Sequence, residues 1–85
     1  MKVSITWTQQ TAAVILNANR PNVPKGFDPE TGTTLFRNVG TMEICERWVF
    51  ITLEDTGEQY GYPLVNISRI WVQRLNYGIH IIYTR

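Results

Sequence analysis

Cysteine and histidine are almost absent from this chain of 85 residues. Cys45 is the only cysteine, so no disulfide can form within the chain and no zinc site can be built from several cysteines, which agrees with a reducing compartment. His80 is the only histidine, and a catalytic Cys–His pair would need it beside Cys45 together with a third, orienting group. Because Cys45 lies in a largely apolar stretch, we expect it to be a buried and unreactive packing residue.

Sequence motifs for catalysis or cofactor binding are also missing. The chain has no glycine-rich phosphate loop, no dinucleotide fingerprint and no spacing typical of metal ligands. A carboxylate pair for hydrolysis would have to come from Glu43, Glu46, Glu54, Asp55 and Glu58. The last three of these bracket a turn, where acids are normally solvated. We therefore predict a protein that is not an enzyme, carries no cofactor or metal, and works by binding.

Long apolar runs are lacking too. The longest uninterrupted apolar stretch, residues 12–16, is far shorter than the ~20 residues that span a bilayer. Residues 1–8 alternate apolar and polar side chains and lack the apolar core and cleavage site of a secretory signal. We expect a cytoplasmic protein without a membrane partner.

What the chain does contain is enough apolar material for one folded domain. Hydrophobic residues make up 44% of the sequence, with three Trp, four Tyr and three Phe, whereas disordered chains are poor in aromatic residues. Chains shorter than about 50 residues rarely close a core of their own, so this length allows one domain and not two. Residues 1–85 are therefore expected to form a single small domain.

The charges are unevenly distributed, although the net charge is only +1. Residues 1–27 and residues 59–85 each hold three cations and no acid, whereas residues 28–58 hold all seven acids and two arginines. If the first and last segments pair in space, the folded protein has a basic side and an acidic side, and this separation influences the choice of partner. Ordinary charge complementarity between neighbouring strands is the alternative interpretation.

The apolar patterns predict a protein made mainly of β-strands. Residues 2–8 place Val3, Ile5 and Trp7 on one side, as in a half-buried strand. Residues 41–54 are the longest strand-like stretch and are apolar on both sides, which is typical of a strand that bends around a core. Further strands are expected at residues 33–37, 59–62, 69–75 and 79–84, with a helical turn at residues 64–68. We therefore predict an all-β or mainly β fold, a small and strongly curved antiparallel barrel of five to seven strands with one short helical turn.

Two segments do not follow this pattern. Residues 11–18 suit either a short buried helix or a central strand, and their β-branched pair favours a strand. Residues 20–32 contain three prolines and two glycines, so regular structure is not expected there and we predict a long loop. Loops of this length in small domains often carry function.

Residues 48–72, WVFITLEDTGEQYGYPLVNISRIWV, have the layout strand, turn, strand, one helical turn, strand. In this layout the segment resembles the second half of small β-barrels of the Sm-like and Src-homology-like kind, where a single-turn helix leads to the last strand. The resemblance implies a barrel, but neither the RNA-binding signature of the first kind nor the acidic ligand-binding loop of the second can be matched residue by residue. The small size and the long loop are also similar to accessory proteins of bacteriophages, which implies the cytoplasm of a host cell.

We predict a protein partner as the first hypothesis. Val23 and Phe27 lie in the proline-rich loop, where an exposed aromatic side chain can anchor in a partner's pocket. Tyr60 and Tyr62 share one strand face beside the turn acids, which suits a basic partner. The predicted partner-binding residues are Val23, Phe27, Asp28, Glu30, Glu54, Asp55, Glu58, Tyr60 and Tyr62. In the alternative interpretation, Phe27 folds back over the open end of the barrel. A free strand edge offers a further route, to a partner or to a second copy of the chain.

Two other functions stay open at this point. Arginines interleaved with aromatic residues near the C-terminal end are the ingredients of a site for single-stranded nucleic acid, in which bases stack on aromatic faces. The residues of this alternative are Arg69, Trp71, Arg74, Tyr77, His80, Tyr83 and Arg85, joined by Lys2. Against it, Trp71 can belong to the core, and dedicated nucleic-acid domains are usually more basic than +1. The third function is that of a structural subunit in a larger assembly, which would form a defined oligomer.

Overall fold

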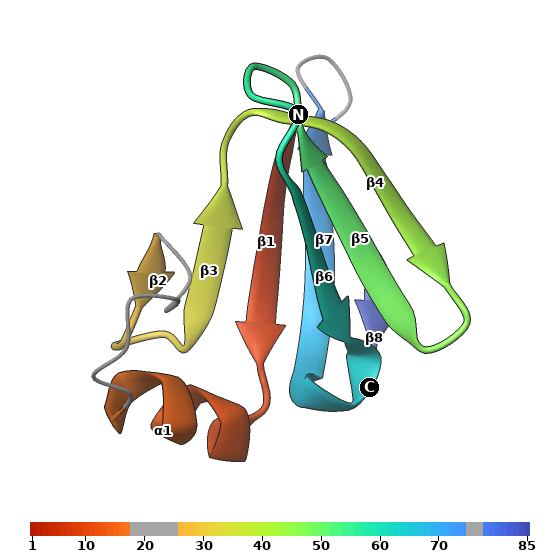
Figure 1. Ribbon diagram of the computed structural model, residues 1–85. Coiled ribbons are helices and arrows are strands. Elements are labelled where there is room, and N and C mark those ends of the chain that lie inside the picture. The colour runs from red at the N-terminus through yellow and green to blue at the C-terminus, as the bar shows by residue number, and fades with distance from the viewer. Residues whose placement is uncertain (18–25, 75–77) are drawn as a thin grey trace.

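The computed structural model describes residues 1–17, 26–74 and 78–85. In this part of the chain eight strands, one α-helix and one 3₁₀ turn follow each other (Figure 1). The strands are β1 (Lys2–Trp7), β2 (Phe27–Asp28), β3 (Thr33–Phe36), β4 (Val39–Cys45), β5 (Trp48–Leu53), β6 (Gln59–Pro63), β7 (Ile67–Arg74) and β8 (Gly78–Thr84). The helix is α1 (Gln9–Asn17) and the 3₁₀ turn is η1 (Leu64–Asn66).

The strands form two antiparallel sheets that enclose one core. The first sheet has the order β2-β3-β1-β7-β8 and the second the order β4-β5-β6. Both sheets contribute fully buried side chains to a single cluster, among them Val3, Ile5 and Ile70 from the first sheet and Val49 and Ile51 from the second. The prediction of a mainly β fold is therefore confirmed.

The predicted closed barrel is wrong, because neither sheet closes on itself in the described residues. The edge strands are β2 and β8 in the first sheet and β4 and β6 in the second. A reciprocal pair of hydrogen bonds joins the two sheets at one corner. The N–H of Val39 donates to the carbonyl of Met1 at 3.0 Å, and the N-terminal amine of Met1 donates to the carbonyl of Val39 at 3.1 Å. The eight strands also exceed the five to seven predicted.

The single long strand predicted over residues 41–54 is a hairpin. β4 and β5 are joined by a turn of two residues, Glu46 and Arg47. Glu46 has a φ of 55°, the left-handed conformation that tight hairpin turns require. Ile44 pairs with Val49 across this turn, so both lie on the inward side of the sheet. The shift of the apolar pattern therefore marks a reversal of the chain and not a bend in one strand.

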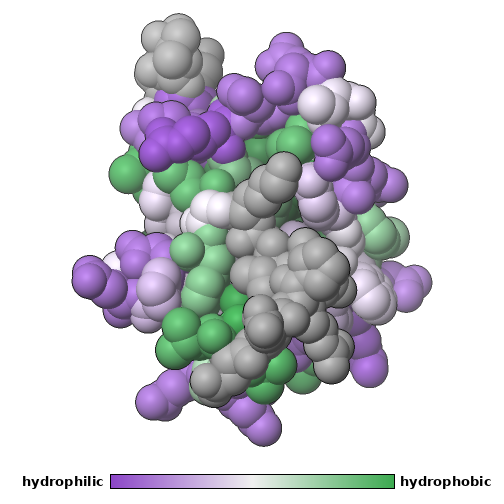
Figure 2. Space-filling model, turned by 60° about the vertical axis from the view of Figure 1, so that its left-hand side comes forward, coloured by the Kyte–Doolittle hydropathy of each residue, from purple (hydrophilic) through white to green (hydrophobic). Residues whose placement is uncertain are grey.

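The apolar pattern of residues 11–18 fits a helix or a strand, and the preference for a strand is wrong. The described part of this segment lies in the helix α1. Thr8 caps the helix through its Oγ1, which accepts a hydrogen bond at 3.3 Å from the backbone N–H three residues later. Ala12 and Ile15 pack against the core, which is the three-residue spacing of one helix face. The remaining apolar side chains of α1 are exposed, and Figure 2 shows apolar surface at the lower end of the molecule, where α1 lies. None of the described helices is long and apolar enough to cross a membrane.

The other elements lie close to their predicted positions. β1, β3, β6, β7 and β8 correspond to the predicted strands, and η1 corresponds to the predicted helical turn. Of the predicted loop at residues 20–32, residues 20–25 lie outside the described residues. Phe27–Asp28 forms the short strand β2, which pairs with β3. Phe27 is half-buried and packs against the core.

Trp7 connects the two sheets at the end of β1. Its indole Nε1–H donates a buried hydrogen bond to Oγ1 of Thr34 in β3, at 2.8 Å. The ring meets Tyr62 of β6 edge to face, with 5.0 Å between the centroids and an interplanar angle of 82°. One side chain thus fixes β1, β3 and β6 relative to each other.

We expect Thr34→Val to lower the free energy of unfolding by about 1–3 kcal/mol, because it leaves the buried indole N–H of Trp7 without an acceptor while conserving side-chain shape. Urea unfolding followed by tryptophan fluorescence measures the change. Thr52→Val is the matched control, since Thr52 is a half-buried strand threonine on the outward side of β5, and it should change the stability by less than about 0.5 kcal/mol. Equal effects of the two variants would contradict the role of this hydrogen bond.

Candidate functional site

A groove lies between the end of β3 and the turn that joins β5 to β6. Its volume is about 300 Å³. The lining residues are Leu35, Phe36, Arg37, Asn38, Leu53, Asp55, Thr56, Glu58, Tyr60 and Tyr62. We call it the tyrosine groove. Four of the predicted partner-binding residues, Asp55, Glu58, Tyr60 and Tyr62, come together here.

The two tyrosines reach the groove because β6 is an edge strand. Tyr60 and Tyr62 pair with Ile51 and Val49, so they lie on the inward side of the second sheet. No further strand of the described chain covers them on the other side of β6. Their rings therefore extend from the core into the space beside β3, where they remain half-buried.

Phe36 joins the two tyrosine rings into one aromatic wall. The centroid of its ring lies 5.8 Å from that of Tyr60 and 6.2 Å from that of Tyr62, in both cases with a tilt of 44°. Trp7 supports Tyr62 from the core side through the edge-to-face contact described above. Aromatic pairs at these distances attract each other beyond the burial of their area, so the wall is held in place before any ligand arrives.

Acidic side chains form the rim of the tyrosine groove. Asp55 and Glu58 are exposed, and Arg37 is the one cation among the residues that line it. The hydroxyl of Tyr60 donates to Oε2 of Glu58 at 2.7 Å. This hydrogen bond raises the pKa of Tyr60, because losing the proton would leave two anions in contact; partial burial and the charge of Glu58 act in the same direction. The rim thus presents fixed acceptor oxygens beside the aromatic wall.

The remaining predicted partner-binding residues are not part of this groove. Asp28 pairs with Thr33, at the end of β3 away from the groove, and its Oδ1 accepts a hydrogen bond from the N–H of Glu30 at 2.9 Å. Phe27 packs on the core, which corresponds to the alternative interpretation of that residue. Glu54 is exposed at the edge of the turn, outside the lining set. Val23 lies outside the described residues.

Sequence reasoning missed the β3 side of the groove. Leu35, Phe36 and Arg37 line it, although they are distant from the tyrosines along the chain. Burial alternates along β3, with Thr34 and Phe36 buried, but the sequence of this strand does not alternate between polar and apolar residues. Nothing in the sequence indicates that the end of β3 lies beside β6, an edge strand of the other sheet.

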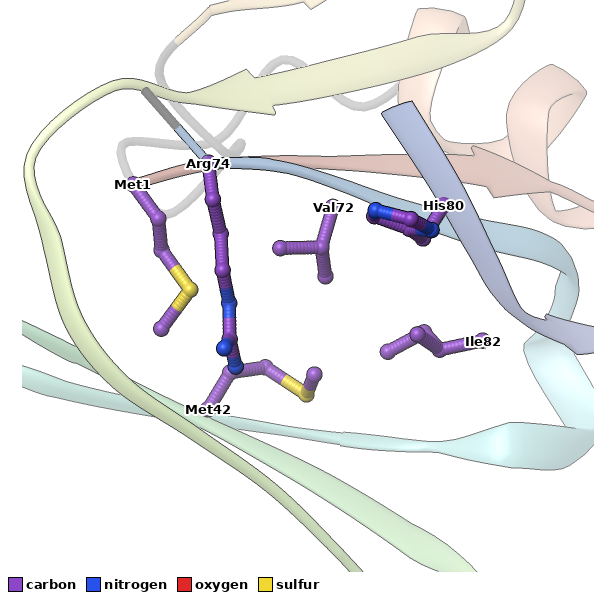
Figure 3. Close-up of a pocket in the computed structure, with 6 residues that line it drawn as sticks. All are labelled: Met1, Met42, Val72, Arg74, His80 and Ile82. Carbon is purple, nitrogen blue, oxygen red and sulfur yellow. The ribbon is translucent and has the colours of Figure 1, made fainter. Parts of the chain in front are cut away.

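A second groove lies between the edge strands β4 and β8 and has a volume of about 460 Å³. We call it the methionine groove; its lining residues are Met1, Met42, Val72, Arg74, His80 and Ile82. Figure 3 shows the side chains of Met42, Val72 and Ile82 directed toward one common space. The two grooves occupy different sides of the molecule and share no lining residue.

The residues of the nucleic-acid alternative are divided between two faces. Trp71 is half-buried on the outer face of the first sheet, because its neighbours Ile70 and Val72 face the core. Trp71 therefore does not take the core position that would count against the nucleic-acid alternative. Arg74 and His80 instead line the methionine groove on the inner side. Lys2 and Arg69 also lie on the outer face, whereas Tyr83 packs against the core on the inner side. Tyr77 lies outside the described residues.

Arg85, the last cation of the nucleic-acid alternative, is held at a different place. Nη1 of Arg85 donates to the carbonyl of Val65 at 2.6 Å, beside η1. The basic and aromatic residues of the C-terminal hairpin therefore do not share one continuous surface in the described chain.

Cys45 is exposed, so the prediction of a buried packing residue is wrong. It is the last residue of β4, on the outer side of the sheet immediately before the hairpin turn, where no second layer covers it. His80 lies on the inner side of β8, in the other sheet. Among the described residues, no group of three or more His, Cys, Asp or Glu side chains is placed to hold a metal ion.

Sequence reasoning also missed a pair of aromatic rings on the outer face of the second sheet. Trp48 and Phe50 are stacked with 6.4 Å between centroids and 16° between planes. Gly61 on the neighbouring strand makes room for them, since a Cβ at that position would lie 3.0 Å from Cε1 of Phe50. Two aromatic residues separated by one residue in a strand are the signal that indicates such a pair.

Comparison of the chain with protein-family models, with curated proteins and with solved structures found no match. The candidate site is defined by the contacts of the tyrosine groove.

The pH dependence of stability provides a test of how deeply Tyr62 lies in this groove. Burial raises the pKa of Tyr62 from the ordinary value of 10.0 to about 12, and the neighbouring Tyr60 acts in the same direction. In the unfolded chain Tyr62 releases its proton near pH 10, whereas in the folded chain it keeps the proton until about pH 12. The stabilisation that protonated Tyr62 gives to the folded chain is thus fully present below pH 10 and is lost as the pH rises toward 12. The free energy of unfolding should therefore fall in this window.

Urea unfolding at a series of alkaline pH values, together with the absorbance of the phenolate, measures this effect. Tyr62→Phe should remove the part of the decline that belongs to Tyr62 and should delete the phenolate step that appears last. If Tyr62→Phe shows the same alkaline decline as the natural chain, the described burial of Tyr62 is contradicted.

Proposed function

We propose that this domain is a non-enzymatic interaction protein that binds a basic segment of a protein partner in the tyrosine groove. The observation that supports this function is the convergence of Tyr60, Tyr62 and Phe36 with the turn acids Asp55 and Glu58 in one groove. Aromatic side chains with a polar tip, placed beside fixed charges, are the residues that dominate the energetics of protein recognition.

The groove chemistry defines the expected partner segment. An arginine or lysine of the partner can lay its apolar stem along the ring of Tyr60 and direct its charged end to Asp55 or Glu58. An apolar side chain next to this cation can enter the groove against Leu35 and Phe36. We therefore expect a segment in which one cation and one apolar residue are neighbours.

The geometry of the wall lowers the cost of binding. Because Trp7 and Phe36 already hold the ring of Tyr62, and Glu58 already holds the hydroxyl of Tyr60, little side-chain freedom remains to be lost when a partner arrives. The negative rim also speeds up the encounter with a basic segment and repels phosphate groups. This second property favours a protein partner over nucleic acid at this groove.

The test uses synthetic peptides with the ¹⁵N-labelled full chain. One peptide carries arginines next to leucines, the second replaces each arginine with glutamine, and the third replaces each arginine with glutamate. We expect the arginine peptide to bind and to shift the amide resonances of β3, β6 and the turn between β5 and β6. Its affinity should fall as salt is added, and the glutamate peptide should not bind.

Two pairs of variants locate the binding site. Tyr60→Ala should weaken binding of the arginine peptide by at least about tenfold, as the loss of a buried aromatic anchor does elsewhere, whereas the adjacent and outward-facing Gln59→Ala should not change it. Asp55→Lys should weaken binding, whereas Glu43→Lys, an exposed acid on the outer side of β4, should not. Equal affinities within either pair would contradict the site. Binding of a single-stranded oligonucleotide in place of the arginine peptide would support the nucleic-acid alternative.

A further inference from the structure

β8 is one of the two edge strands of the first sheet in the described chain. One side of this strand of seven residues pairs with β7, and no other strand of the described chain pairs with its opposite side. Backbone N–H and C=O groups therefore point outward along the edge, where another strand can bind to them.

The side chains of β8 do not protect this edge. Soluble proteins usually interrupt an exposed edge with lysine, with other charges or with proline, and Gly78–Thr84 contains none of these. Ile79 and Ile81 are 59% and 60% exposed. They oppose Gln73 and Trp71 of β7, so both lie on the outer face of the sheet. Such an edge is typical of a strand that is covered by a partner strand.

The sequence of this edge is complementary to itself. The segment Ile79-His80-Ile81 has the same sequence in both directions. A two-fold axis at His80 therefore creates two equivalent pairs, each with Ile79 of one chain opposite Ile81 of the other. Cross-strand pairs of β-branched residues stabilise antiparallel strands. At Ile82 the register with β7 shifts, because Ile81 pairs with Trp71 while Tyr83 pairs with Ile70. The regular part of the edge is thus the short segment that carries the symmetric pattern.

We infer that β8 pairs antiparallel with β8 of a second copy of this chain, about a two-fold axis at His80. The two five-stranded sheets then continue into each other across the axis. A closed two-fold contact of this kind uses the same surface on both copies and leaves no further edge to add more chains at β8. The matched isoleucine residues and the absence of Asp, Glu, Lys and Arg from Gly78–Thr84 favour a second copy of β8 over a basic or acidic partner strand.

The surroundings of β8 are compatible with this contact. The methionine groove lies between the inner side of β8 and β4, so space of about 460 Å³ is available beside the edge. The tyrosine groove lies on another side of the molecule and is unaffected, so the inference does not depend on the proposed function. A single pair of short strands buries less than the roughly 1,200–2,000 Å² of a standard stable interface. We therefore expect a dimer that dissociates on dilution.

Sedimentation equilibrium of the full chain over a range of concentrations tests the dimer. The mass should rise from that of one chain, 9.8 kDa, toward twice this value as the concentration increases into the millimolar range. Ile81→Lys should weaken association at least tenfold, because it replaces an apolar cross-strand pair with a charge, while circular dichroism and thermal unfolding remain those of a folded chain. Val65→Lys is the matched control, since Val65 is 65% exposed but lies on η1, and it should associate like the natural chain. A natural chain that is monomeric throughout, or an Ile81→Lys variant that associates as strongly as Val65→Lys, would overturn the inference.

Disulfide trapping tests the register with folded, full-length chains. In a Cys45→Ser background, His80→Cys should cross-link to its own copy under mild oxidation, because directly opposed strand residues have Cα atoms about 4.5–5.5 Å apart, within the range of a disulfide. Ile79→Cys is the control, since each Ile79 opposes Ile81 of the copy and its own counterpart lies beyond the ~7 Å that a disulfide can bridge. Faster cross-linking of Ile79→Cys than of His80→Cys would overturn the proposed axis.

Discussion

The structure depends on the buried indole of Trp7. A buried N–H group without an acceptor destabilises a fold by about 1–3 kcal/mol, so the position of the indole and that of Thr34 are determined together. The backbone N–H of Trp7 donates to the carbonyl of Gly32 at 3.0 Å, which fixes the start of β3 as well. Tyr62 packs against the edge of the same ring. The aromatic wall of the tyrosine groove is therefore an extension of the contact that holds the two sheets together.

Two open sides follow from sheets that do not close into a barrel. A domain of this size has much surface for its volume, and each sheet keeps two edges. The side between β3 and β6 is lined by tyrosines and turn acids, whereas the side between β4 and β8 is lined by methionine, isoleucine and valine with Arg74 and His80. The first side is aromatic with an acidic rim, and the second borders the apolar edge of β8. One small fold can thus present two different surfaces without interference between them.

The apolar pattern predicts the structure correctly where a segment fits a single period and fails where it fits more than one. The strict alternation of residues 2–8 predicted β1 correctly, because a strand with one buried face repeats every two residues. The same signal failed at residues 41–54, because a turn of two residues and a bend both change which positions are apolar. It failed at α1 as well, where a short apolar stretch fits either period and the cap at Thr8 decides for a helix. The expectation that Cys45 is buried rests on residues 41–54 forming one strand, whereas Cys45 stands at the exposed end of β4, directly before the turn.

The mainly β character, the helical turn at η1 and the grouping of Tyr60, Tyr62, Asp55 and Glu58 could be predicted from the chain alone, because these features arise from neighbouring residues. Three features could not be predicted in this way: Phe36 and Leu35 complete the tyrosine groove, Asp28 and Glu30 lie away from it, and β8 is an edge strand. The order of strands in a sheet depends on contacts between distant segments, such as the hydrogen bond from Trp7 to Thr34, and local patterns do not indicate which segments will meet.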